Sequence, residues 1–203
     1  MNNLKTIKSI LVTNTRSYSD STSVASDLAG LIAKSGKRVL LVDADFHRPI
    51  VHQVYNLPNR VGFFEVLLGE RNATEIRHFL PEINLSVITS GKVPHDLDGV
   101  ISGEKISTFI KTQIKDFDKI IIHGPPFFYP ETTTLASLVD GVVLMIHPGY
   151  AKSETSRAII EKFQRSGATI IGIIMRNQPR HSANQSAFID RLLSYDKQVR
   201  INS

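Results

Sequence analysis

Apolar residues along the chain gather into short, nearly continuous runs, and longer segments with helical spacing separate these runs. Runs that are rich in β-branched residues and do not alternate with polar residues are typical of strands covered on both faces. We therefore expect them to form a buried sheet. Six such runs are present: Ser9–Thr13, Val39–Val42, Leu85–Thr89, Lys119–Ile122, Val142–Ile146 and Thr169–Met175.

Three segments between the runs repeat apolar residues at the spacing of one helix face, which predicts amphipathic helices. Gly36 and Gly167 stand just beyond the first and the third of these segments, the usual place of a glycine that ends a helix. The apolar positions are Val24, Leu28, Leu31 and Ile32 in the first segment, Ile106, Phe109, Ile110 and Ile114 in the second, and Ile159, Ile160 and Phe163 in the third.

The alternation of strands and helices predicts an α/β fold with a doubly wound, mostly parallel sheet. We expect one domain over residues 1–203. Residues 49–81 are longer than a simple crossover and contain short helical pieces, including Gly62–Leu68. We interpret this segment as an insertion on one edge of the sheet.

The composition narrows the possible functions. The chain has no cysteine, which excludes disulfides, thiol catalysis and zinc–thiolate sites. No apolar run approaches the roughly 18 residues that would span a bilayer, so a cytoplasmic location is expected. The net charge of +5 is mild, and no basic stripe with interleaved aromatic residues accompanies it, so no nucleic-acid partner is expected.

Ligands of a doubly wound sheet bind at the carboxyl ends of its strands. Polar residues follow four of the predicted strands, and these segments therefore hold the candidate chemistry. They are Asn14–Ser23, Val42–Pro49, His123–Pro126 and Met175–Asn177.

Motifs in and between these segments carry a family resemblance. The sequence DADFHRP at Asp43–Pro49, the Asn59–Gly62 segment, Pro125-Pro126 and Val139–Val142 occur in a characteristic order and spacing. With them the chain resembles the cytoplasmic ATPase domain of bacterial tyrosine kinases, the BY-kinases of capsule and exopolysaccharide assembly. These belong to the MinD/ParA-like branch of P-loop proteins. The resemblance implies a P-loop NTPase-like three-layer sandwich with a deviant Walker motif.

The phosphate loop departs from the family pattern, which reads approximately P-G-E-G-K-S-T. Two glycines that would let the backbone wrap phosphate are replaced, and the lysine that would neutralise it is a serine. Losing one charge-assisted hydrogen bond weakens binding by roughly 10- to 150-fold. The corresponding residues here are Ser17, Tyr18, Asp20, Ser21, Thr22 and Ser23.

Asp20 replaces a glycine of that loop just before the expected helix start at Ser21. One hypothesis is that its carboxylate occupies the positive end of the helix dipole, so that the protein carries its own anion in the phosphate site. The other is that Asp20 is merely a good N-cap that remained after binding was lost.

Other positions that the resemblance assigns to chemistry are also altered. His123 stands where the family has an aspartate that helps to hold magnesium, and imidazole is a poor magnesium ligand. We expect His123 to be a neutral, hydrogen-bonded imidazole at the strand end. Arg176 stands where the family has an asparagine that contacts the base. Tyr195 stands alone where the family has a cluster of phospho-acceptor tyrosines.

The acidic motif that the family uses for magnesium and catalysis is retained as Asp43 and Asp45. Because the phosphate loop and the second magnesium ligand are replaced, we interpret both carboxylates as structural, with Arg48 as a candidate partner. Thr22 could still reach a magnesium ion, but no lysine lies beside it.

Two further segments leave alternatives open. Phe127, Phe128 and Tyr129 form either a partner-binding rim or a flap over the empty nucleotide pocket, and an exposed Phe128 would favour the rim. The C-terminal run with Phe188 and Leu192 has helical spacing, as expected of either the last helix of the sandwich or a MinD-like membrane-targeting helix.

The sequence thus predicts a catalytically inactive BY-kinase homologue, a pseudokinase without catalytic residues, bound metal or ATP. The resemblance implies a scaffold or regulatory role in exopolysaccharide or capsule secretion, peripheral to the inner face of the plasma membrane. Its partner would be the cytoplasmic part of a polysaccharide co-polymerase or another secretion subunit, in a homo- or hetero-oligomer. The alternatives are an atypical active kinase or ATPase that uses Asp43 and Asp45, and a MinD/ParA-like membrane-associated positioning protein.

Overall fold

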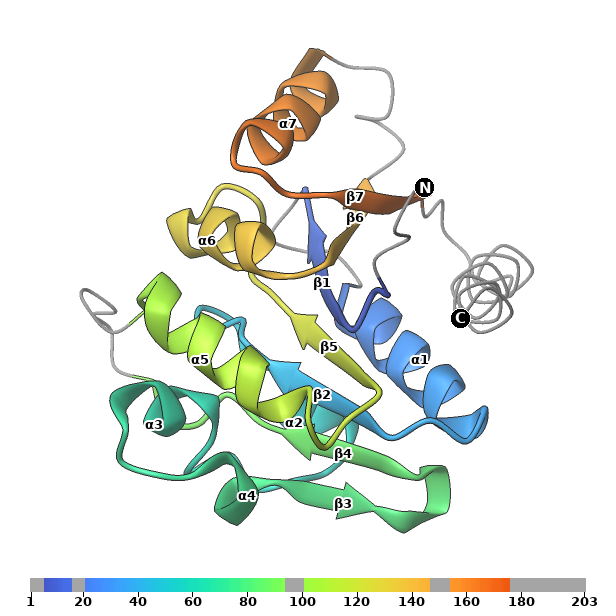
Figure 1. Ribbon diagram of the computed structural model, residues 1–203, viewed down its shortest axis with the longest axis vertical. Coiled ribbons are helices and arrows are strands. Elements are labelled where there is room, and N and C mark those ends of the chain that lie inside the picture. The colour runs from blue at the N-terminus through green and yellow to red at the C-terminus, as the bar shows by residue number, and fades with distance from the viewer. Residues whose placement is uncertain (1–5, 16–20, 94–100, 147–153, 176–203) are drawn as a thin grey trace.

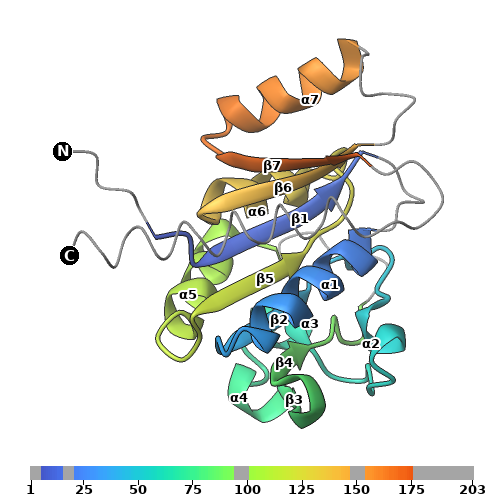
Figure 2. The ribbon, with the colours of Figure 1, turned by 90° about the vertical axis from the view of Figure 1, so that its right-hand side faces the viewer.

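A central sheet with helices on both faces organises the chain (Figures 1 and 2). The computed structural model describes residues 6–15, 21–93, 101–146 and 154–175. Seven strands lie in the order β3-β4-β2-β5-β1-β6-β7, and all pairs are parallel except β3 with β4. Their bounds are β1 Ser9–Asn14, β2 Val39–Asp43, β3 His78–Leu80, β4 Leu85–Ile88, β5 Lys119–His123, β6 Gly141–Ile146 and β7 Ile170–Met175.

The five inner strands β1, β2, β4, β5 and β6 are buried on both faces, as the continuous apolar runs predict. The run that forms β7 was also expected to be buried, but as an edge strand it leaves Ile173 and Met175 47% and 63% exposed. Successive residues of one strand enter different cores: Ile10 and Val12 of β1 pack on the side of α1 (Ser21–Lys34), whereas Leu11 packs on the opposite side. That opposite side is covered by α5 (Gly103–Gln113), α6 (Pro130–Leu138) and α7 (Glu154–Arg165), as Figure 2 shows. The predicted doubly wound, mostly parallel α/β fold is confirmed.

The predicted edge insertion contains more regular structure than the sequence pattern indicates. Residues 49–81 hold three short helices and the antiparallel edge strand β3, which was not expected. A turn of 3-10 helix, η1 (Pro81–Ile83), leads from β3 into β4. The helices are α2 (Val51–Val54), α3 (Phe63–Leu68) and α4 (Ala73–Ile76).

One helix position differs from the prediction. Leu31 was expected on the buried face of α1, but it is 41% exposed, whereas Val24, Leu28 and Ile32 are buried. Leu31 lies at the margin of the apolar stripe, where periodicity alone separates core from surface poorly. Gly36 follows α1 with φ +86°, as expected of a glycine beyond a helix end.

The Asn59–Gly62 segment fastens the insertion to the end of β4. The Asn59 side-chain oxygen accepts from the Gly91 amide at 2.9 Å, and the Glu65 carboxylate accepts from the Gly62 amide at 2.7 Å. The backbones approach so closely that a Cβ on Gly62 would lie 2.2 Å from the Thr89 carbonyl oxygen. The retained asparagine and glycine therefore have a structural explanation that requires no ligand.

We expect the same substitution to have opposite effects at two glycines. Gly62→Ala should destabilise the fold by about 1–3 kcal/mol or more, because the obstructing atoms belong to the backbone. Gly30→Ala should stabilise it by about 0.5–1 kcal/mol, because position 30 is inside α1 and a Cβ there meets no atom within 4 Å. Urea unfolding of both variants measures the difference, and equal midpoints would contradict the close approach at Gly62.

Candidate functional site

His123 lies at the carboxyl end of β5, and the sheet register decides its main contact. β5 pairs with β2 so that His123 stands opposite Asp43. The imidazole Nδ1 is 3.0 Å from the Asp43 Oδ1, and both side chains are almost completely buried, at 1% and 0% exposure. Because an ionised carboxylate can only accept hydrogen bonds, we place a proton on Nδ1.

The other imidazole nitrogen faces the start of α1. His123 Nε2 lies 3.2 Å from the Ser21 hydroxyl and 3.1 Å from the Thr22 hydroxyl. Asn14, the last residue of β1, donates from its side-chain amide to the Ser21 oxygen at 2.7 Å, which leaves the Ser21 proton available for Nε2. Asn14, Ser21, His123 and Asp43 thus form one buried polar chain across three strand ends.

Both oxygens of Asp43 already accept hydrogen bonds from the protein. Oδ2 accepts from the amides of Ile50 and Val51, each at 3.1 Å. Oδ1 accepts from the Asp45 amide at 3.3 Å in addition to facing His123. The carboxylate therefore closes the turn after β2 and satisfies amides at the start of α2.

Asp45 is 5% exposed and accepts from the Arg48 backbone amide at 3.0 Å. The predicted contact between the acidic motif and Arg48 thus involves the backbone amide of Arg48 and Asp45. Burial raises the pKa of the Asp45 carboxyl above its usual value, and nearby His123 and the Arg48 amide only partly oppose this shift. A raised carboxyl pKa means that the ionised form is costly in the folded state.

This shift predicts a pH-dependent stability. As pH rises from 3.8 through the raised pKa of Asp45, the unfolded state releases this proton before the folded state does, so the stability falls. Asp45→Asn removes that titration and still offers an oxygen to the Arg48 amide. We expect the variant to melt a few degrees higher than the wild type near neutral pH and to converge with it below pH 3.8.

Asp118 provides a control of the opposite sign. Hydrogen bonds from Arg38 hold the pKa of the Asp118 carboxyl below its usual range, so its stabilising contribution is present above the usual pKa and is lost as pH falls through the lowered one. Asp118→Asn should therefore lower the melting temperature near neutral pH. Parallel melting curves against pH for the wild type and Asp45→Asn would contradict the pKa assignment.

An aromatic cluster follows β5 at the same edge of the sheet. The Phe127 amide donates to the Asn14 carbonyl at 3.0 Å and its side chain packs against the core, whereas Phe128 is 44% exposed. Tyr129 stacks on His47 with ring centroids 3.6 Å apart, and His47 Nε2 also contacts the Glu131 carboxylate. The exposure of Phe128 favours the rim over the flap.

Several predicted positions lie outside the described residues. They are Ser17, Tyr18, Asp20, Arg176 and the C-terminal run with Phe188 and Leu192. The hypotheses on the Asp20 carboxylate, on Arg176 and on a membrane-targeting helix therefore stay predictions. Ser23 lies in α1.

Sequence reasoning missed two parts of the site. Asn14 was not singled out, although it precedes the altered loop directly, and its side chain binds Ser21. The stacking of His47 on Tyr129 was also not foreseen, because it joins segments that follow different strands. The described ranges contain no group of three or more metal-ligating side chains, and no helix within them is long and apolar enough to cross a membrane.

Comparisons with known proteins identify relatives. No protein-family model matches the chain. It is 32% identical over 164 residues to the tyrosine-protein kinase ptk of Acinetobacter johnsonii, which covers 79% of this chain but only 22% of that longer protein. It is 28% identical over 173 residues to the tyrosine-protein kinase YwqD of Bacillus subtilis, covering 85% of this chain and 73% of the relative.

Solved structures share the fold. The kinase domain of the Escherichia coli tyrosine kinase ETK superposes with a TM-score of 0.79 at 22% identity, over 88% of this chain and 72% of that one. The chimerical protein CapA2B2 gives 0.78 at 23% identity, over 86% and 77% of the two chains. The cell division ATPase MinD of Pyrococcus furiosus gives 0.72 at 20%, over 92% and 79%.

Proposed function

Because the homologues of this chain are bacterial tyrosine-protein kinases, we propose that it is a catalytically inactive relative of them, a pseudokinase. It would act as a scaffold or regulatory component of a bacterial exopolysaccharide or capsule synthesis and secretion system. The observation that carries the proposal is the buried chain of hydrogen bonds from Asn14 through His123 to Asp43.

This chain of hydrogen bonds is a poor match for magnesium. Magnesium prefers oxygen ligands in octahedral geometry. Here an imidazole lies between the Thr22 hydroxyl and the Asp43 carboxylate, and three backbone amides also donate to Asp43. A metal would have to displace these partners inside the protein, which supports the expected loss of the magnesium site.

The position of the family's phosphate-binding lysine is equally poor for phosphate. Ser21 is 2% exposed, and its hydroxyl oxygen is occupied by the Asn14 amide. Serine itself brings no positive charge to the position that the family's lysine occupies. Phosphoryl transfer depends on the positioning and neutralisation of the transferred group, so these features support a loss of kinase chemistry.

A partner-binding role fits the rim of Phe127, Phe128 and Tyr129 at the carboxyl ends of the strands, because Phe128 is exposed while the other two are half-buried. Exposed aromatic side chains are enriched at interfaces. Phe128 is 44% exposed, and its ring contacts the rings of Phe127 and Tyr129. We propose that the partner is the cytoplasmic part of a membrane polysaccharide co-polymerase or another subunit of the secretion complex. The protein would then lie at the inner face of the plasma membrane.

Calorimetric titration with ATP and ADP tests the proposal. The chain should be freed of nucleotide and metal, and titrated with millimolar magnesium present. We expect no heat of binding at millimolar nucleotide and no transfer of phosphate to a tyrosine substrate. Micromolar binding together with phosphate transfer that Asp45→Ala abolishes would overturn the proposal in favour of an atypical active kinase.

A further inference from the structure

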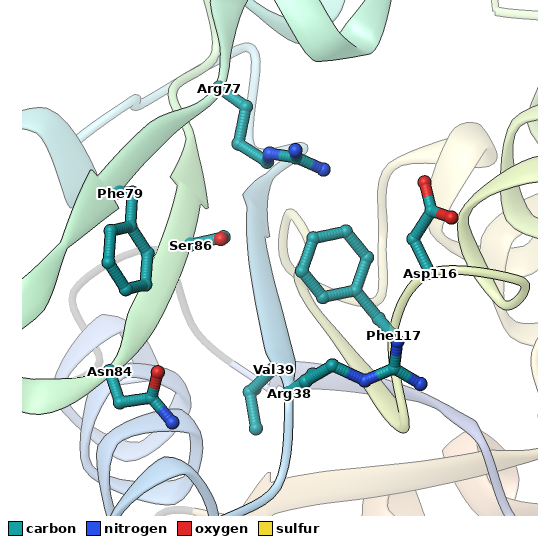
Figure 3. A pocket seen from close by; sticks show the side chains of 8 residues that line it. All are labelled: Arg38, Val39, Arg77, Phe79, Asn84, Ser86, Asp116 and Phe117. Atoms are coloured by element: carbon teal, nitrogen blue, oxygen red, sulfur yellow. The ribbon is translucent and has the colours of Figure 1, made fainter.

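A cavity lies at the amino end of β2, whereas the candidate site lies at the carboxyl ends of the strands. It has a volume of about 230 Å³ and opens beside the amino end of β2, at Val39 (Figure 3). The length of β2 separates it from Asp43, roughly 13–17 Å for a five-residue strand. Its lining includes Arg38, Arg77, Phe79, Ser86, Asp116 and Phe117.

Arg77 leaves hydrogen-bonding capacity unused at this cavity. Its Nη1 is buried and has no hydrogen-bond partner among the described residues. The guanidinium lies over the Phe117 ring with Cζ 5.1 Å from the ring centroid, a cation–π contact that holds it in place (Figure 3). A buried donor of a charged group without an acceptor is unfavourable, so an anion from outside would satisfy it.

Two phenyl rings form apolar walls of the cavity. Phe79, on the edge strand β3, is 59% exposed, and its neighbour on β4 in the antiparallel register is Ser86. Phe117 is 7% exposed and belongs to the core. Figure 3 shows Ser86 between the two rings. An aromatic ring entering here would cover the exposed Phe79 and contact Phe117.

The charges around the cavity leave Arg77 as the group that would bind an anion. Arg38 is bound to Asp118 at 3.2 Å, and the Asp116 carboxylate also lines the cavity. With Asp118 included, two guanidinium groups face two carboxylates, so the cavity has no net charge and only the unused buried donor of Arg77 favours an anion. A cavity of about 150 Å³ is enough to hold benzene, so the larger volume here admits a ring and an acidic group.

We propose that this cavity binds an aryl anion, that is, one aromatic ring bearing a phosphate or carboxylate group. The ring lies between Phe79 and Phe117, and the acidic group accepts from Arg77. Two sources share this chemistry: a phosphotyrosine side chain of another protein and a free aryl acid. The site is independent of the pseudokinase proposal, because none of its residues belongs to the buried chain around His123.

The test uses phenyl phosphate, benzoate and a short phosphotyrosine peptide, titrated into the complete chain and followed by ligand-detected NMR. We expect phenyl phosphate to bind, and we expect inorganic phosphate and the unphosphorylated peptide to bind at least tenfold more weakly. Inorganic phosphate lacks the aromatic ring, and the unphosphorylated peptide lacks the acidic group. Binding of the phosphopeptide as well assigns the site to a protein ligand. Binding of phenyl phosphate or benzoate without the peptide assigns it to a small molecule.

Two variants locate the binding. Arg77→Met keeps an unbranched apolar side chain without the guanidinium and should weaken phenyl phosphate binding by about 10- to 100-fold. Phe79→Leu removes an exposed ring, which spares the core, and should weaken binding by about 2- to 10-fold. Ile173→Val, at an exposed position on β7 at the opposite edge of the sheet from β3, is the control and should leave phenyl phosphate binding unchanged. No binding of any aryl anion at millimolar concentration, or equal affinities for wild type and Phe79→Leu, would overturn the proposal.

Discussion

The triple variant Asp20→Gly, Ser21→Lys, His123→Asp should bind ATP with magnesium at least 10- to 100-fold more tightly than the wild type. Lysine supplies the missing charge for phosphate, and glycine at position 20 removes a negative charge and frees the loop backbone. Aspartate at position 123 replaces the imidazole between Thr22 and Asp43 with an oxygen donor. Calorimetry with and without magnesium measures the gain.

Two controls separate charge from loop geometry. Asp20→Gly with Ser21→Met and His123→Asp has the same relaxed loop and no lysine, and it should gain little affinity. Asp20→Gly with Ser21→Lys alone keeps His123 beside the helix start, so its binding should depend weakly on magnesium. If the triple variant binds no better than the wild type at millimolar ATP, then the altered loop and His123 are not what prevents binding.

Replacing His123 with leucine should destabilise the protein by about 3–5 kcal/mol. The substitution leaves the completely buried Asp43 carboxylate with backbone amides but without its imidazole partner, and it also removes the acceptor that faces Ser21. Urea unfolding near neutral pH measures the loss. The effect should exceed that of the same substitution at His52, whose Nδ1 has no hydrogen-bond partner in the described part of the chain.

A double-mutant cycle tests whether the pair itself is responsible. Asp43→Asn removes the charge and keeps an oxygen for the amides of Ile50 and Val51. Asp43→Asn should lower the free energy of unfolding of the His123→Leu variant less than it lowers that of the wild type. In the His123→Leu variant it removes a buried charge that has already lost its imidazole partner. Additive losses for the two substitutions would show that His123 and Asp43 are not coupled.

The five inner strands could be predicted from the sequence because each is covered on both faces and is therefore almost continuously apolar. The contact between His123 and Asp43 could not be predicted, although both residues were recognised as candidates. They are 80 positions apart, and only the pairing of β2 with β5 makes them neighbours. The short edge strand β3 was missed because three residues are too few to show a period.

The partner of the acidic motif illustrates a second limit of sequence reasoning. Arg48 was the candidate partner of Asp43 and Asp45. The structure shows Asp45 accepting from the Arg48 backbone amide and Asp43 accepting from the amides of Ile50 and Val51. Backbone donors have no signature in the residue types, so carboxylates that satisfy a turn look like carboxylates that hold a metal.

The turn that Asp43 closes has an evolutionary consequence. A carboxylate that folds the chain after β2 and pairs with a buried histidine contributes to stability, and selection for stability is sufficient to retain it. Under the proposed loss of metal binding, a return would require His123 and the hydrogen bonds around Asp43 to change together. A retained acidic motif in a gene of this kind is therefore a poor marker of enzymatic activity. The residue that faces it on the neighbouring strand, His123 here, is a better marker.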